Sequence, residues 1–302
     1  MYKDRINKIA QEIKNQQIAF NNLVKRFNED IKINSFEKYN MEQWCHTAFK
    51  DSLAKVSIIA ENNFNSIESF SLVSTARYIC ELNIRLTLIA KDSRYGLVYY
   101  GQLINDQIGY WKSFKEQLDR EIIFLQDLEL DEQKICEQKI DELKTISDEK
   151  IKFEKAAALA TDVLKIIDDK ASRKFSIHAE QAETNGYGCQ AYLIKNKQLT
   201  DVILYLNSVQ NEKKLYESSV QNEIIKLTKG WNWKDKARET NTLDEYEFIY
   251  TFTSRMLHAT PANISTNFKQ LSDQEMIMFL KYIKIKLNDI NELSVNFLSQ
   301  CN

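Results

Sequence analysis

The chain has 302 residues, of which 43% are hydrophobic and 28% charged, and its formal net charge is -2. This balance is typical of a globular chain with an ordinary core, and it creates no global positive field that would attract duplex nucleic acid. There are only one proline and six glycines. Because β-rich folds need many more turn residues, the composition predicts an all-α fold, a multi-helix bundle.

Five cysteines are spread along the chain, at Cys45, Cys80, Cys136, Cys189 and Cys301. They form no C-x-x-C pair, so the sequence predicts neither a disulfide framework nor a zinc site, and free thiols fit a reducing cytoplasm.

The first residues lack the apolar core of a signal peptide, and no apolar run reaches the roughly 20 residues of a membrane span. We expect a cytoplasmic protein with no membrane segment. Its many Lys, Asn and Ile residues point to an AT-rich bacterial genome.

Apolar residues at helical spacing predict that residues 1–112 form the N-terminal part of the bundle. An amphipathic helix is expected over residues 1–33, and a second helix follows an N-terminal cap at Asn40. Ser66 or Ser69 opens a third helix. Because this third helix is apolar on much of its circumference, it should lie in the core.

Residues 113–185 are expected to form a long charged helical hairpin inserted into the bundle. Just before it, residues 94–111 hold three glycines among several aromatic residues, and should be the least regular part of the first half. From residue 113 to 170 there is no Gly or Pro, and we place the turn near Asp127 to Asp131. A solvated hairpin is the simplest interpretation, with pairing between subunits as the alternative.

Residues 186–302 are expected to complete the bundle. The sequence Asn-Gly-Tyr-Gly at 185–188 is the strongest break in the chain. A helix is predicted from about residue 190 to Gly230, where a glycine follows basic residues of the last turn. Ser272 and Glu275 form a capping box that opens the final helix.

One further helix is predicted in this last part. Thr242 and Glu245 form a capping box at its start. Pro261 should end it near His258, because the residue before a proline leaves the helical region. Arg255 and His258 are then three residues apart in the last turn and share a face. The negative end of the helix dipole favours the charged form of such a histidine.

Two clusters could carry chemistry, and the first lies on the apolar third helix. Arg77, Glu81 and Arg85 follow one another at intervals of four residues. Charges on a buried helix must be paired, because an isolated buried charge is strongly destabilising. These residues are therefore either an internal salt bridge that joins helices or a polar site between them.

The second cluster comprises Tyr246, Tyr250, Ser254, Arg255 and His258. Its alternative interpretation is a core-facing tyrosine stripe that ends in a histidine cap.

The other two histidines are His178, which follows Arg173 in the chain, and His46. Arg173 and His178 lie five positions apart, and so about 140° apart on a helix. They could act together only if the helix were broken before Asn185, which the sequence does not predict. His46, beside Trp44 in an amphipathic helix, is interpreted as structural.

Several catalytic motifs are missing from the sequence. There is no G-x-x-x-x-G-K-[ST], G-x-G-x-x-G, H-E-x-x-H or G-x-S-x-G pattern, and no Glu lies three residues before a His. We expect no metal site, no cofactor and no serine hydrolase.

Taken together, the two clusters resemble an uncharacterised bacterial all-helical family that is loosely similar to the HEPN superfamily (higher eukaryotes and prokaryotes nucleotide-binding). The resemblance covers residues 70–112 and 231–262. The motifs that carry it are Arg-x-x-x-Glu (Arg77, Glu81), a tryptophan-rich connector, Tyr-x-x-x-Tyr (Tyr246, Tyr250) and Ser-x-x-x-His (Ser254, His258).

HEPN proteins are helical bundles, and many are metal-independent ribonucleases whose Arg-x4-6-His site is completed by dimerisation. The resemblance implies that Arg255 stabilises the developing charge on a phosphate and that His258 is the general acid or base. The 2′-hydroxyl of the RNA would be the nucleophile. The other site residues implied are Arg77 and Glu81 in the catalytic site and Tyr246, Tyr250 and Ser254 in substrate binding.

We therefore expect a metal-independent ribonuclease that acts on RNA as a homodimer, in a bacterial antiphage defence or toxin system. Membranes and duplex DNA are not expected partners. Arg255 and His258 have only two residues between them, whereas Arg173 and His178 match the family spacing outside the region of resemblance. The alternatives are a catalytically inactive interaction or ligand-sensing module that acts through a partner protein encoded nearby, and a purely structural scaffold.

Overall fold

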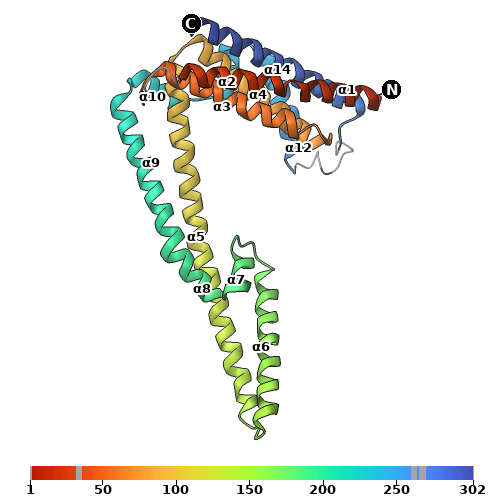
Figure 1. Cartoon of the computed structure of the whole chain (residues 1–302), viewed down its shortest axis with the longest axis vertical. Coiled ribbons are helices and arrows are strands. Elements are labelled where there is room, and N and C mark those ends of the chain that lie inside the picture. The colour runs from red at the N-terminus through yellow and green to blue at the C-terminus, as the bar shows by residue number, and fades with distance from the viewer. Residues whose placement is uncertain (1, 32–35, 260–263, 265–269, 302) are drawn as a thin grey trace. The chain divides into compact units, whose positions relative to one another are not determined.

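The computed structural model describes residues 2–31, 36–259, 264 and 270–301. All regular elements in these ranges are helical, so the predicted all-α, multi-helix fold is confirmed (Figure 1). The helices are α1 (Tyr2–Asn15), α2 (Gln17–Ile31), α3 (Met41–Asn62), α4 (Ser69–Lys91), α5 (Arg94–Leu143), α6 (Glu149–Ala171), α7 (Ala179–Asn185), α8 (Tyr187–Leu193), the π-helical η1 (Ile194–Gln198), α9 (Leu199–Ser219), α10 (Asn222–Lys229), α11 (Trp233–Glu239), α12 (Leu243–Leu257) and α14 (Asp273–Cys301).

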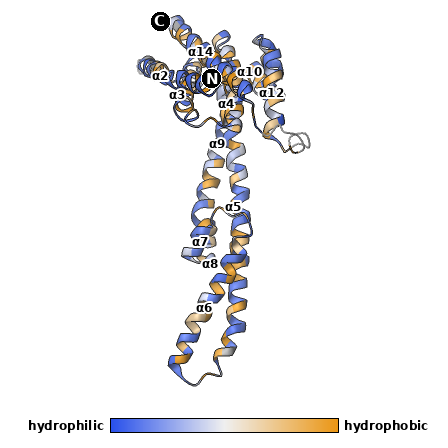
Figure 2. Ribbon diagram, turned by 90° about the vertical axis from the view of Figure 1, so that its right-hand side faces the viewer, coloured by the Kyte–Doolittle hydropathy of each residue, from blue (hydrophilic) through white to orange (hydrophobic). Residues whose placement is uncertain are grey.

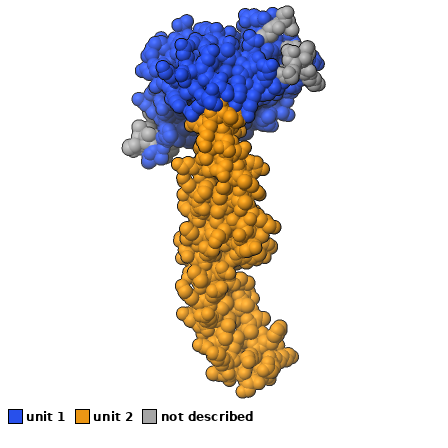
Figure 3. All heavy atoms as spheres, turned by 90° about the vertical axis from the view of Figure 1, so that its left-hand side faces the viewer, with its two compact units in different colours: residues 1–103, 216–302 blue, residues 104–215 orange. Residues whose placement is uncertain are grey.

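The chain divides into two compact units (Figure 3). Unit 1 consists of Met1–Leu103 and Tyr216–Asn302, and unit 2 of Ile104–Leu215. The hairpin predicted for residues 113–185 lies within unit 2, which begins earlier and ends later than that prediction.

Helix α4 forms the centre of unit 1. It packs against α3, α11, α12 and α14, and it buries Val73, Ala76 and Ile79 completely. The prediction that this helix lies in the core is confirmed. Helix α14 also packs along α1 and α2, so the two ends of the chain meet over α4. The single helix predicted for residues 1–33 is in fact two helices, α1 and α2.

Residues 94–111 are not irregular, and this prediction was wrong: they form the first five turns of α5. A Cβ at Gly96 would overlap the carbonyl oxygen of Met41, and one at Gly101 would overlap the hydroxyl of Tyr216. These two glycines therefore permit close approach of neighbouring elements rather than a turn.

The turn predicted near Asp127 to Asp131 was also misplaced. Helix α5 continues to Leu143, because a long run without Gly or Pro offers nothing to stop it. The reversal comes at residues 144–148, where Asp148 caps α6. Its carboxylate accepts hydrogen bonds from the backbone N–H groups of Lys150 (2.9 Å) and Ile151 (3.2 Å).

Unit 2 has a narrow core in which α5 and α6 pack together with α7, α8 and the start of α9. Figure 2 shows hydrophobic residues along the whole length of these helices. The buried set is Leu118, Ile122, Leu125, Leu128, Val163, Ile167, Ala171, Ala182, Tyr187, Ala191, Ile194 and Val202. Beyond it, neither residues 105–117 of α5 nor residues 203–215 of α9 include a buried side chain.

The strongest predicted break is confirmed at Gly186, whose φ of 87° lies in the left-handed region that favours glycine. The helix predicted from about residue 190 to Gly230 ends where expected, since the N–H of Gly230 donates to the oxygen of Lys226 at 2.9 Å. It is not continuous, however, because a connection at Val220 and Gln221 separates α9 from α10.

Candidate functional site on helices α4 and α12

Helix α12 begins after Thr242 as predicted, but the predicted capping box is wrong. The Thr242 side chain makes no cap hydrogen bond, and its hydroxyl lies 2.8 Å from that of Thr240 instead. The Glu245 carboxylate accepts a hydrogen bond from Tyr282 (2.6 Å) and pairs with Lys286 (3.1 Å), both on α14. Tertiary partners therefore outcompete the local cap, and Glu245 anchors α12 to α14.

The capping box at Ser272 and Glu275 does form. The Glu275 carboxylate accepts from the N–H of Ser272 (2.8 Å), and the Ser272 hydroxyl accepts from the N–H of Glu275 (3.3 Å). This box lies at the start of α14, where its glutamate has no competing partner on another helix among the described residues.

Helix α12 ends at Leu257, and His258 is its C-cap, so the predicted end is confirmed. His258 has extended backbone angles (φ -107°, ψ 143°), and its N–H donates to the oxygen of Ser254 at 3.2 Å. Thr260 and Pro261, to which the sequence assigns this ending, lie outside the described residues.

The two clusters predicted from the sequence meet between α4 and α12. The Arg77 guanidinium lies over the ring of Tyr250, 4.6 Å from its centroid, and its Nε donates to Glu81 Oε1 at 3.0 Å. The Tyr246 and Tyr250 rings lie 5.7 Å apart. Because Arg77 and Glu81 are only half-buried, their ion pair is both an internal salt bridge and part of a surface that solvent can reach.

Tyr246 is a neutral hydroxyl in this cluster. Burial and, to a smaller extent, the Glu81 carboxylate raise the pKa of Tyr246 to about 12, against a smaller opposing effect of Arg77. At neutral pH this tyrosine can therefore act as a hydrogen-bond donor, and it is not a base.

The C-terminal part of the second cluster is arranged differently. The Ser254 hydroxyl oxygen is buried and has no hydrogen-bond partner in the described ranges. Arg255 is exposed and forms no ion pair with another described residue, and His258 is exposed as well. Arg255 lies about 140° around the helix from Tyr250, so it does not join the group that Arg77 occupies.

Arg85, the third residue of the cluster that the sequence predicts on α4, contacts the connector before α12. The Arg85 guanidinium stacks over the rings of Trp231 (4.7 Å), which precedes α11, and Trp233 (5.4 Å), which begins it. Stacking of this kind holds an arginine in place and covers the aromatic faces. It explains why the connector before α12 is rich in tryptophan.

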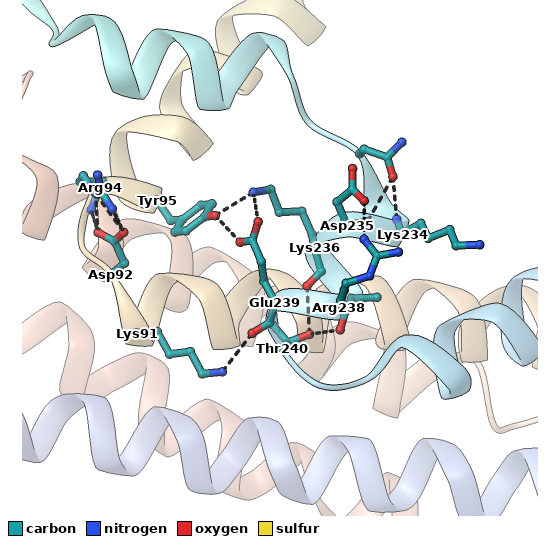
Figure 4. A network of polar contacts seen from close by, with 12 residues as sticks. Lys91, Asp92, Arg94, Tyr95, Lys234, Asp235, Lys236, Arg238, Glu239 and Thr240 are labelled. Atoms are coloured by element: carbon teal, nitrogen blue, oxygen red, sulfur yellow. Dashed lines mark hydrogen bonds and ion pairs between the residues drawn. The ribbon is translucent and has the colours of Figure 1, made fainter.

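Lys236, on α11, is the most deeply buried cation of this region, and the sequence analysis missed it. Its ammonium donates to Tyr95 Oη (2.8 Å) and Glu239 Oε1 (2.7 Å), and the Tyr95 hydroxyl donates to Glu239 Oε2 (2.6 Å) (Figure 4). Burial alone would lower the pKa of Lys236, but the bonds to Glu239 and Tyr95 outweigh it and raise the pKa. In the sequence, only the three-residue spacing of Lys236 and Glu239 indicated this ion pair, and the same spacing is common on solvated helices.

Arg173 and His178 do not lie on a helix, contrary to expectation. Helix α6 ends at Ala171, and both residues belong to the connection 172–178 in unit 2. The His178 Nδ1 atom lies 2.7 Å from Gln181 Oε1, and its buried Nε2 has no partner in the part of the chain that is described. His46 packs edge-on against the rings of Phe27 and Phe297, as its structural interpretation predicts.

Among the described residues, no three His, Cys, Asp or Glu side chains are grouped as metal ligands. None of the helices in these ranges has the length and apolarity to cross a membrane. The chain matches none of the protein-family models, curated proteins or solved structures with which it was compared.

Proposed function

We propose that the chain is a metal-independent, HEPN-like ribonuclease that acts as a homodimer in a bacterial antiphage defence or toxin system. The observation that carries this proposal is the end of α12, where Arg255, an exposed cation without an ion pair among the described residues, precedes the exposed His258 by three positions. An accessible guanidinium can bind a phosphate, and an imidazole can move protons near neutral pH.

In the proposed reaction, the 2′-hydroxyl oxygen of one ribose attacks the adjacent phosphorus, and the bond from phosphorus to the 5′-oxygen breaks. The products are a 2′,3′-cyclic phosphate and a 5′-hydroxyl end. His258 accepts or donates the transferred proton, and Arg255 stabilises the negative charge that develops on the phosphate. No metal is required, because the nucleophile belongs to the RNA.

The remaining predicted site residues differ in role. Arg77 is already engaged by Glu81 and Tyr250, so we assign it to positioning: it holds the middle of α12 against α4. We assign Ser254 to substrate binding because its hydroxyl has no described partner, but this hydroxyl is buried, so a substrate must displace neighbouring side chains to reach it. Tyr246 keeps its proton at neutral pH, so its proposed role is to donate a hydrogen bond to the substrate.

The test is incubation of the purified full-length protein with total cellular RNA in excess EDTA. Arg255→Ala and His258→Ala should each abolish cleavage, whereas Arg26→Ala, which removes an exposed arginine on α2, should cleave like the wild type. A single 2′-deoxy substitution at a mapped cleavage position should block that cut. Full activity in His258→Ala would show that the site is wrong, and no cleavage by the wild type would refute the function.

The second candidate function, a non-catalytic interaction module, is favoured by the surface of unit 2. Large hydrophobic side chains are exposed there on helices that bury little, and the most exposed on α5 and α9 are Tyr110, Ile123, Leu204 and Tyr205. Such a surface marks a contact with another protein. It predicts a stable complex with a protein encoded nearby, lost in Tyr110→Ser/Leu204→Ser, and no RNA cleavage.

A further inference from the structure

The connection between α6 and α7, residues 172–178, has an unusual surface. Its sequence is Ser-Arg-Lys-Phe-Ser-Ile-His, with two cations and no acidic residue. Phe175 is 82% exposed, more than any other large hydrophobic residue described. Arg173 is exposed and forms no ion pair with a described residue. An aromatic ring in water, preceded in the chain by two positively charged residues, is therefore presented on one short loop.

The backbone of this loop is fixed from beneath. Glu121 on α5 is only 2% exposed, and its carboxylate accepts hydrogen bonds from the Ser176 hydroxyl (2.6 Å) and the N–H of Ile177 (3.1 Å). At the other end, the N–H of Lys174 donates to the oxygen of Ala171 (3.2 Å). A loop held on both sides of Phe175 loses little conformational entropy when something binds to it.

We propose that this loop binds single-stranded RNA, with a base stacked on the ring of Phe175 and phosphates held by Arg173 and Lys174. The proposal rests on the proposed function, because it names a substrate contact for the ribonuclease. Base stacking on an exposed aromatic ring, combined with cations along the backbone, is the usual way in which single strands are bound. A duplex keeps its base faces covered, so it cannot use Phe175 in this way.

Lys174 also shows how the loop is oriented. Its ammonium lies 5.3 Å from the centroid of the Phe124 ring, at the rim of the unit 2 core. This contact fixes the Lys174 charge at the rim of the unit 2 core, one residue before Phe175 in the chain.

The test uses the full-length protein and a short, fluorescently labelled 2′-O-methyl RNA strand, which cannot be cut by attack of its 2′-oxygen. Phe175→Ala should weaken binding roughly 5- to 150-fold, the range for loss of one stacked base. Phe153→Ala is the matched control, because Phe153 is 76% exposed in the same unit but lies between one lysine and one glutamate. It should bind like the wild type.

Two further measurements test the charges and the strandedness. Arg173→Gln/Lys174→Gln should lower the slope of log Kd against log salt by about 1.4, since each cation on a single strand contributes about 0.7. The same strand annealed to its complement should bind more weakly and should not respond to Phe175→Ala.

Equal affinities of Phe175→Ala and Phe153→Ala, an unchanged salt slope, or no binding by the wild type would each overturn the proposal. Because the probe cannot be cut, its binding is independent of catalysis. Binding through Phe175 without cleavage of natural RNA would refute the ribonuclease and leave the loop as an RNA contact. Cleavage of natural RNA, together with unchanged binding by Phe175→Ala, would support the ribonuclease and refute the loop as an RNA contact.

Discussion

The ion pair of Lys236 and Glu239 leads to an asymmetric prediction, because the two partners differ in burial. The Lys236 side chain is 6% exposed, whereas that of Glu239 is 45% exposed. Replacing Glu239 leaves an ammonium inside the protein, with the Tyr95 hydroxyl as its remaining hydrogen-bond partner among the described residues. Replacing Lys236 leaves a carboxylate that water can reach and that Tyr95 still contacts at 2.6 Å.

The free energies of unfolding should reflect this difference. Breaking a buried pair so that one charge is stranded costs about 3–5 kcal/mol, and the remaining bond to Tyr95 places Glu239→Met near the lower value, at about 3 kcal/mol. For Lys236→Met we expect the free energy of unfolding to fall by about 1 kcal/mol. This is the net loss of the hydrogen bonds of Lys236, because Glu239 still reaches water and Tyr95 still donates to Glu239. For a unit of this size the midpoint of thermal unfolding should fall by roughly 6–12 °C and 2–4 °C, respectively.

The assay is thermal and urea unfolding followed by tryptophan fluorescence, to which Trp231 contributes beside Lys236. The double variant Lys236→Met/Glu239→Met should be no less stable than Glu239→Met, because it removes the stranded charge. If Lys236→Met proved the more destabilising single change, the argument from burial would be refuted.

The dependence of stability on pH provides a second test of the same pair. In the wild type the pKa of Glu239 is held below its usual value of 4.5, since the bonds from Lys236 and Tyr95 outweigh the effect of burial. A lowered folded-state pKa contributes stability that is present above pH 4.5 and is lost as the pH falls through the folded value. This acid-side contribution should shrink in Lys236→Met.

The remaining predictions concern packing and alkali. Gly101→Ala should destabilise unit 1 by about 1–3 kcal/mol, because the new methyl group meets the Tyr216 hydroxyl. Gly109→Ala should stabilise α5 by about 1 kcal/mol, because no atom lies within 4 Å of the new methyl group. Urea unfolding measures both changes, and a more stable Gly101→Ala or a less stable Gly109→Ala would contradict the respective prediction. The pKa of Tyr246 in the folded protein is raised from 10.0 to about 12, so the folded state favours the neutral hydroxyl. The stability that this hydroxyl contributes should be lost as the pH rises from about 10 to about 12. Tyr246→Phe should lack this loss when its unfolding is measured at alkaline pH.

The fold class and the central helix followed from residue types and spacing, but the role of individual glycines did not. Gly101 reads as a helix breaker in isolation, and only the position of Tyr216, far along the chain, shows that a side chain is excluded there. Likewise, the pattern of a capping box is present at both Thr242 and Ser272. It forms only at Ser272, because Glu245 has stronger partners on α14. Local patterns hold where no tertiary contact competes.

In the candidate site, too, the sequence predicted the residue types but not the contacts between helices. Residue types identified Arg77 and Glu81 on one helix and Tyr246 and Tyr250 on another, but nothing in the sequence placed Arg77 over Tyr250. That contact changes the interpretation of the arginines. An arginine that is paired and stacked holds helices together, so the structure assigns Arg77 a positioning role. Arg255 differs from Arg77 in this respect, since it is exposed and forms no ion pair with another described residue.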